Sequence, residues 1–121
     1  MNSQRPLLSI KLKNMVRKKA SERDGYEPEF SLSNILVNGN KRGCSGFIGN
    51  PLNGTVVYVD TEPCAYGGIT GYLYRYAKSV GNYSGHGRNH FTDEYDPEML
   101  AADVVGFLRH AKGERSYDMN F

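Results

Sequence analysis

Three short apolar runs, at residues 35–37, 44–48 and 55–59, constrain the fold of this chain more than any other feature. Two turns rich in Asn and Gly separate them, and these residues tolerate the positive φ angles of tight turns. The last run, Thr-Val-Val-Tyr-Val, consists of β-branched and aromatic residues that favour strands. Short apolar runs separated by such turns predict a three-stranded antiparallel meander.

An N-terminal helix is predicted at residues 6–22. Lys, Arg, Ala, Met and Leu are good helix formers, and apolar residues recur here at helical spacing. Leu8, Ile10 and Leu12 also alternate as in a strand, so an extended first half is the alternative. Gly25 is expected to end the helix, since glycine readily adopts the left-handed conformation found after helix C-termini.

Two helices are predicted after the meander. Residues 69–80 place Leu73 and Tyr76 on one helical stripe, and a glycine follows this segment. Further along, Asp96 is a suitable N-cap, and Pro97 suits the first helical position because its missing N–H costs little there. An apolar face at helical spacing follows the proline, which predicts the last helix.

The predicted element order is α-β-β-β-α-α, an α+β fold in which one N-terminal and two C-terminal helices pack the meander. The 121 residues match the usual size of one domain. We therefore expect a single domain over residues 1–121, with a flexible tail at 114–121. Residues 81–95 form a long polar loop, and loops of this length are often functional.

The predicted compartment is the cytoplasm. No apolar run approaches the roughly 18 residues that a membrane span requires. The apolar pair Leu7 and Leu8 is soon interrupted by Lys11, unlike the apolar centre of a secretory signal. Cys44 and Cys64 suit a reducing compartment as free thiols, with one disulfide as the alternative.

Two Cys and two His raise the question of a metal site. Cys44, Cys64, His86 and His90 are together a suitable tetrahedral zinc set, and the two His have finger-like spacing. The two Cys lie far apart, without the short knuckle that preorganises two thiolate ligands. We therefore predict no metal and no cofactor.

Cys44 is also a candidate nucleophile. Lys41 and Arg42 precede it closely, and nearby cations lower the pKa of a thiol. A loop His could act as base, oriented by Asp93 or Glu94. No familiar catalytic Cys signature is present, and free Cys is among the most buried residue types. The sequence therefore favours a buried strand thiol over an enzyme, and we assign no catalytic residue.

Lys41 and Arg42 are candidate anion contacts as well. They lie in a Gly-rich segment, residues 39–43, that could present backbone N–H groups and two cations to a phosphate. The segment lacks the Walker pattern, and the alternative interpretation is a plain hairpin turn.

The lack of a coherent catalytic set favours a non-enzymatic protein that docks on a larger protein or nucleoprotein complex. Charge is divided unevenly: residues 1–50 carry nine Lys/Arg and four acidic residues, whereas residues 51–121 carry six and nine. Such an asymmetry could steer a partner. Tyr and Arg are favoured interface anchors, and the predicted contact residues are Tyr72, Tyr76, Tyr83, Arg88 and His90.

Nucleic-acid binding is the alternative function. Tyr and basic residues interleave over residues 72–90, where rings could stack on bases and cations could hold phosphates. The basic N-terminal helix would add Lys11, Lys18 and Lys19. Against this, the net charge is only +2 and the pI of 8.5 lies below the guide value of about 9 for basic domains.

The overall profile resembles accessory proteins of phages and mobile elements. These proteins are small and intracellular, and the shared features are a helix-flanked meander, no catalytic signature, and Tyr and Gly in the loops. Inhibitors of host defence systems are one such group, and they often act by covering a nucleic-acid-binding or active surface of a larger complex. The resemblance is one of general architecture and transfers no residue role.

Overall fold

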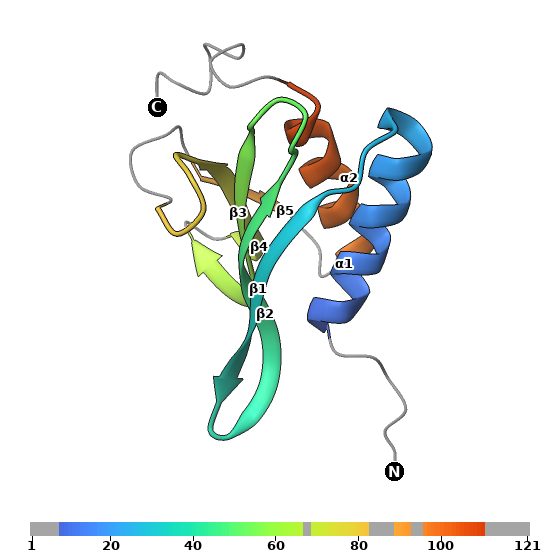
Figure 1. Cartoon of the computed structure of the whole chain (residues 1–121). Coiled ribbons are helices and arrows are strands. Elements are labelled where there is room, and N and C mark those ends of the chain that lie inside the picture. The colour runs from blue at the N-terminus through green and yellow to red at the C-terminus, as the bar shows by residue number, and fades with distance from the viewer. Residues whose placement is uncertain (1–7, 67–68, 83–88, 93–95, 111–121) are drawn as a thin grey trace.

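The computed structural model describes residues 8–66, 69–82, 89–92 and 96–110. Its centre is a five-stranded antiparallel sheet with strand order β1-β2-β3-β4-β5, and two helices lie on the same side of this sheet (Figure 1). The strands are β1 (Glu29–Val37), β2 (Asn40–Gly49), β3 (Val56–Tyr66), β4 (Ile69–Ala77) and β5 (His90–Thr92). The helices are α1 (Leu8–Lys19), continued by the π-helical turn η1 (Ala20–Asp24), and α2 (Pro97–Leu108).

The fold is α+β, but the predicted three-stranded meander with two C-terminal helices is wrong. In the part of the chain that the structure describes, the sheet has five strands, and the helix predicted at residues 69–80 is largely strand β4. Over residues 72–76 of β4, the alternating side chains of Tyr72, Tyr74 and Tyr76 are buried in the core. A period of two is a strand pattern. Pairing with β3 favours the strand over the predicted helix, because the ladder places these rings against the core.

Strand β5 lies inside the segment predicted to be a loop at residues 81–95. It pairs with β4, and His90 lies opposite Tyr74 in the register. Three residues are too few to show a strand pattern in the sequence, so only the pairing reveals this element. Much of the remaining segment and the predicted tail at 114–121 lie outside the described residues.

Several boundaries follow local sequence signals. Asn38 (φ 52°) and Gly39 (φ 81°) form the tight turn between β1 and β2, as φ > 0 at both positions requires. Gly25 (φ 72°) ends η1 in the left-handed conformation. At the start of α2, the side chain of Asp96 accepts a hydrogen bond of 2.9 Å from the backbone N–H of Glu98. Each of the three apolar runs lies mainly in one strand.

The hydrophobic core lies between the two helices and the sheet. Helix α1 contacts β1 and β2, helix α2 contacts β3 and β4, and the helices contact each other. Burial of the aliphatic side chains between them stabilises the fold by roughly 25 cal/mol per Å² of apolar area. Fully buried members are Leu12, Val16, Ile48, Val57, Val59, Leu100, Val104 and Leu108. Within the described residues, neither helix is long and apolar enough to cross a membrane.

Candidate functional site

The predicted contact residues of β4 and β5 lie in the packed interior or beside it. Tyr72 is 5% and Tyr76 is 7% exposed, and the hydroxyl of Tyr76 donates to the backbone carbonyl of Phe107 at 3.0 Å. His90 is partly buried and stacks on Tyr74, with ring centroids 5.5 Å apart. Tyr76 and His90 therefore join the sheet to α2 through Phe107, and Tyr72 is part of the hydrophobic core. The other two predicted contacts, Tyr83 and Arg88, lie outside the described residues.

The predicted anion contacts lie near the tip of the β1–β2 hairpin. Lys41 is exposed, whereas the side chain of Arg42 is outside the described part of the chain. The backbone of residues 40–43 is part of β2, and Lys41 pairs with Leu36 in the register. The register shifts at Arg42, as in a β-bulge, but Asn40, Lys41 and Gly43 continue the ladder with β1 instead of forming a concave turn around a phosphate. An anion contact by the Lys41 side chain stays a prediction.

Cys44 occupies a buried position in β2. The residue is 0% exposed, its thiol is free, and its backbone N–H donates to Oγ1 of Thr61 at 2.6 Å. Burial raises the pKa of the Cys44 thiol, partly opposed by its hydrogen bond with the Thr61 side chain. The neutral thiol is thereby favoured over the nucleophilic thiolate. This environment supports the interpretation of Cys44 as a structural strand residue.

The proposed alternative of a metal-bound Cys44 has no support in the described part of the chain. No group of three or more His, Cys, Asp or Glu side chains gathers there closely enough to hold a metal ion. The side chains of Cys64 and His86 are not among the described ones.

Because Cys44 is buried, we expect its thiol to be unreactive in the folded protein. In a Cys64→Ser variant, in which Cys44 is the only thiol, iodoacetamide at about pH 8 should modify Cys44 only after the protein unfolds. Mass spectrometry of native and urea-unfolded samples measures this directly. Rapid modification of the native protein would contradict the buried, neutral thiol and return Cys44 to the list of candidate nucleophiles.

The face of the sheet away from the helices carries a row of larger side chains. Phe47, Tyr58 and Arg75 lie opposite one another on β2, β3 and β4 in the register. The rings of Phe47 and Tyr58 meet edge to face, with centroids 5.4 Å apart. All three residues are partly exposed and lie outside the hydrophobic core. We call this row the outer sheet face.

Sequence reasoning did not single out the outer sheet face. The strands β2 and β3 were expected, and the alternation of Val57 and Val59 with Tyr58 was visible. Alternation shows that two faces exist, but only the packing of the helices decides which face is covered. The sequence predicts a helix at Arg75, so it does not predict that Arg75 lies beside Tyr58 in a sheet.

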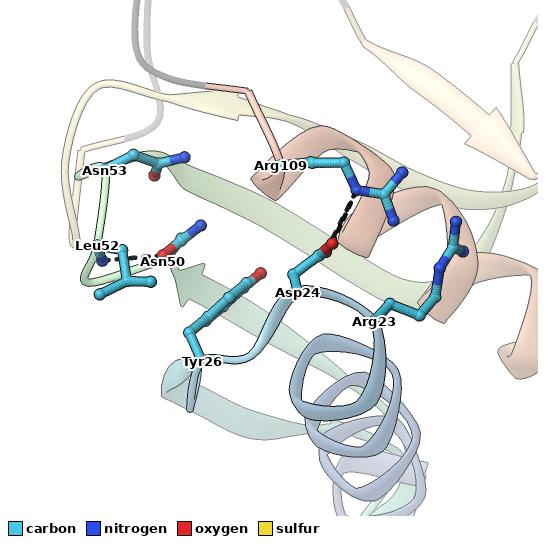
Figure 2. A pocket seen from close by; sticks show the side chains of 7 residues that line it. All are labelled: Arg23, Asp24, Tyr26, Asn50, Leu52, Asn53 and Arg109. Atoms are coloured by element: carbon cyan, nitrogen blue, oxygen red, sulfur yellow. Dashed lines mark hydrogen bonds and ion pairs between the residues drawn. The ribbon is translucent and has the colours of Figure 1, made fainter.

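A polar pocket of about 450 Å³ lies where η1, the β2–β3 turn and the end of α2 meet (Figure 2). The Nε of Arg109 donates to both carboxylate oxygens of Asp24, at 3.2 and 3.3 Å. The side chain of Arg109 is 39% exposed and that of Asp24 19%, so this ion pair is half-buried. The lining includes Arg23, Asp24, Tyr26, Asn50, Asn53 and Arg109.

Two Asn side chains attach the β2–β3 turn to the end of α2 and so form one wall of the pocket. The Nδ2 atoms of Asn50 and Asn53 donate to the backbone carbonyl of Leu108, at 2.9 and 3.1 Å. The Oδ1 of Asn50 accepts the backbone N–H of Leu52 at 2.9 Å. Asn is suited to this turn because its side chain satisfies nearby backbone groups. The carbonyl at the helix end is thereby paired rather than left exposed.

Tyr26 is the least expected member of the pocket. It is 6% exposed, and its buried hydroxyl has no hydrogen-bond partner among the described residues. Burial raises the pKa of Tyr26 to about 12, and the Asp24 carboxylate adds to this rise while Arg109 opposes it. Figure 2 shows the hydroxyl pointing toward the side where Asp24 lies. A buried hydroxyl without a hydrogen bond lowers stability by about 1–3 kcal/mol, so a hydrogen bond to the Tyr26 hydroxyl would be favourable.

No protein family, characterised protein or solved structure matches this chain.

Proposed function

We propose that the protein is a small, non-enzymatic, cytoplasmic binding protein that docks on a larger protein through the outer sheet face. The observation that carries this proposal is the row of Phe47, Tyr58 and Arg75 on the face that neither helix covers. Aromatic residues and Arg are enriched in protein interfaces and in their hot spots. An accessory or inhibitor subunit that covers a functional surface of its partner would need such a row.

The charge of the outer sheet face favours a protein partner over nucleic acid. Among the side chains that the structure describes on the central strands, Arg75 is the cation of this face, and Asp60 lies on the same face, opposite Leu73 of β4. A surface that binds phosphates carries a clear excess of Lys and Arg. A near-neutral surface with two aromatic rings instead suits the apolar centre of a protein interface.

Nucleic-acid binding is retained as a second candidate because of helix α1. Lys11 and Lys18 are exposed on this helix and lie two turns apart, so they share one face. Arg17 is exposed beside them but pairs with Glu27 at 2.6 Å. Such a stripe can contact phosphates, and its binding would weaken steeply with salt.

Capture of the tagged protein with its partner, with and without nuclease, tests the docking proposal. We expect a stoichiometric protein partner that survives nuclease. The affinity of this partner should fall at least about tenfold when Phe47 and Tyr58 are both replaced by Ala, because hot-spot rings contribute more than their neighbours. Surface plasmon resonance with the purified partner measures the change.

Two matched variants make this test specific. Met99→Ala removes an exposed apolar side chain from α2, far from the row in the sheet, and should leave the affinity unchanged. Ser31→Glu places a charge on the exposed residue that pairs with Phe47, so it probes the same face without removing a ring. Unchanged affinity in both face variants would refute the proposal. A partner lost on nuclease treatment and on Lys11→Glu/Lys18→Glu substitution would establish the nucleic-acid alternative.

A further inference from the structure

We propose that the polar pocket binds the phosphate group of a small phosphate monoester between Arg23 and Arg109, while Asp24, released from Arg109, accepts a hydrogen bond from Tyr26. The pocket shares no residue with the outer sheet face. The inference is therefore independent of the docking proposal, and each can fail without the other.

The positive charge of the pocket is only partly neutralised. Two guanidinium groups, those of Arg23 and Arg109, face one carboxylate, that of Asp24. Within the described ranges, the side chain of Arg23 has no hydrogen bond or ion pair, and that of Arg109 contacts Asp24 through Nε alone. Figure 2 shows the terminal nitrogens of both Arg residues on the same side of Asp24. Guanidinium groups bind phosphate oxygens through paired N–H donors, so this excess charge suits a phosphate.

The buried hydroxyl of Tyr26 explains how the pocket can accept a second anion beside Asp24. A phosphate that takes the Arg109 guanidinium, including the Nε that now donates to Asp24, leaves the Asp24 carboxylate without its partner. The hydroxyl of Tyr26 has no hydrogen-bond partner among the described residues and points to the side where Asp24 lies (Figure 2). A hydrogen bond from Tyr26 to Asp24 would satisfy both groups, and bonds to a charged acceptor are stronger than neutral ones. The exchange replaces one ion pair with an Arg–phosphate pair and a Tyr26–Asp24 hydrogen bond, and these two interactions must outweigh the repulsion between the phosphate and the Asp24 carboxylate.

The pocket also has the size and local polarity that a small phosphorylated molecule requires. A volume of about 450 Å³ lies within the usual range of small-molecule sites. The carbonyl end of α2 would repel an anion through the helix dipole. Asn50 and Asn53 donate to the Leu108 carbonyl at this end, and the Arg109 cation follows it. These groups oppose the negative end of the dipole at the pocket wall.

Titration calorimetry of the full chain tests the inference. The ligands are inorganic phosphate and ribose 5-phosphate, and sodium chloride keeps the ionic strength constant. Both compounds should bind and should raise the midpoint of thermal unfolding, because a ligand of the native state stabilises it. Arg23→Gln and Arg109→Gln should each weaken binding at least about tenfold, since each removes charge-assisted hydrogen bonds. Lys18→Gln removes an exposed cation outside the pocket and should bind as the wild type does.

Tyr26→Phe separates the proposed exchange from a purely structural role of the ring. Without ligand, the unfolding midpoint should be unchanged or higher, because the variant removes a buried hydroxyl that has no partner. Phosphate affinity should nevertheless fall, because the Asp24 carboxylate then has no Tyr26 hydroxyl that can donate a hydrogen bond to it. Wild-type affinity in Tyr26→Phe would refute the exchange.

Equal binding of acetate and phosphate, or no binding by the wild type, would refute the phosphate site. Arg23 is exposed, so Arg23→Gln keeps the test valid if Arg109→Gln fails to fold.

Discussion

Gly46→Ala is expected to lower the free energy of unfolding by about 3 kcal/mol or more, at the upper end of what single substitutions cost. Gly46 lies in β2 with φ 144°, a conformation that residues with a side chain rarely adopt. An added Cβ would overlap the carbonyl oxygen of Ser31 and lie 2.9 Å from the Cα of Leu32. Both atoms belong to the backbone of β1, which is held in the ladder and cannot rotate away.

Gly49→Ala is the matched control for this substitution. Gly49 lies in the same strand, its φ is not in the positive range, and the nearest atoms to an added Cβ are 3.8 Å away. We expect it to change the free energy of unfolding by less than about 1 kcal/mol, as methyl additions without strain do. Urea denaturation followed by circular dichroism measures both variants. Equal effects of the two substitutions would show that the close approach of β1 and β2 at Gly46 is not rigid.

Phe107→Ala is expected to have the second largest effect, about 3 kcal/mol, because the ring joins α2 to the end of the sheet. Its centroid lies 4.4 Å from that of Tyr76 in a stacked arrangement. It also meets Tyr74 and His90 edge to face, at 5.1 and 4.9 Å. Removing the ring leaves a cavity among three aromatic neighbours and loses the contact that attaches β5 to the helix.

Two further variants check this expectation, one at position 107 and one elsewhere on α2. Phe107→Leu keeps most of the apolar volume and should cost less than the Ala variant. Met99→Ala truncates a side chain that is 44% exposed, and should cost less than about 1 kcal/mol. Thermal and urea unfolding measure stability, and the His90 and Tyr74 ring resonances report on the packing. A Phe107→Ala variant as stable as Met99→Ala would show that this aromatic cluster does not hold α2 to the sheet.

Local chemistry was enough to place several elements from the sequence. The cap formed by Asp96 and the following Pro97 predicted where α2 begins. The Asn38–Gly39 turn predicted the first hairpin, and Gly25 predicted the end of the N-terminal helical segment. In each case a few adjacent residues supply the hydrogen bond or the φ angle that the element needs, so distant parts of the chain add little.

Strand β4 shows where local reasoning fails. The spacing of Leu73 and Tyr76 is compatible with a helix, and the alternation of Tyr72, Tyr74 and Tyr76 is compatible with a strand. The choice depends on β3, whose Val59 pairs with Tyr74 and whose backbone supplies the hydrogen bonds of the ladder. Strand preference depends on neighbouring strands and on burial, which a segment cannot show by itself.

Local sequence patterns were enough to predict an α+β chain with an N-terminal helix, three central strands and a capped last helix. Tertiary structure alone decided which side chains share a surface. Asp24 and Arg109 are 85 residues apart in the chain, yet they pair in one pocket. The burial that leaves the Tyr26 hydroxyl without a partner, and the helices that leave Phe47 and Tyr58 partly exposed, also depend on contacts between distant segments. Hydrogen bonds and solvent exclusion act through space, and only folding brings these groups together.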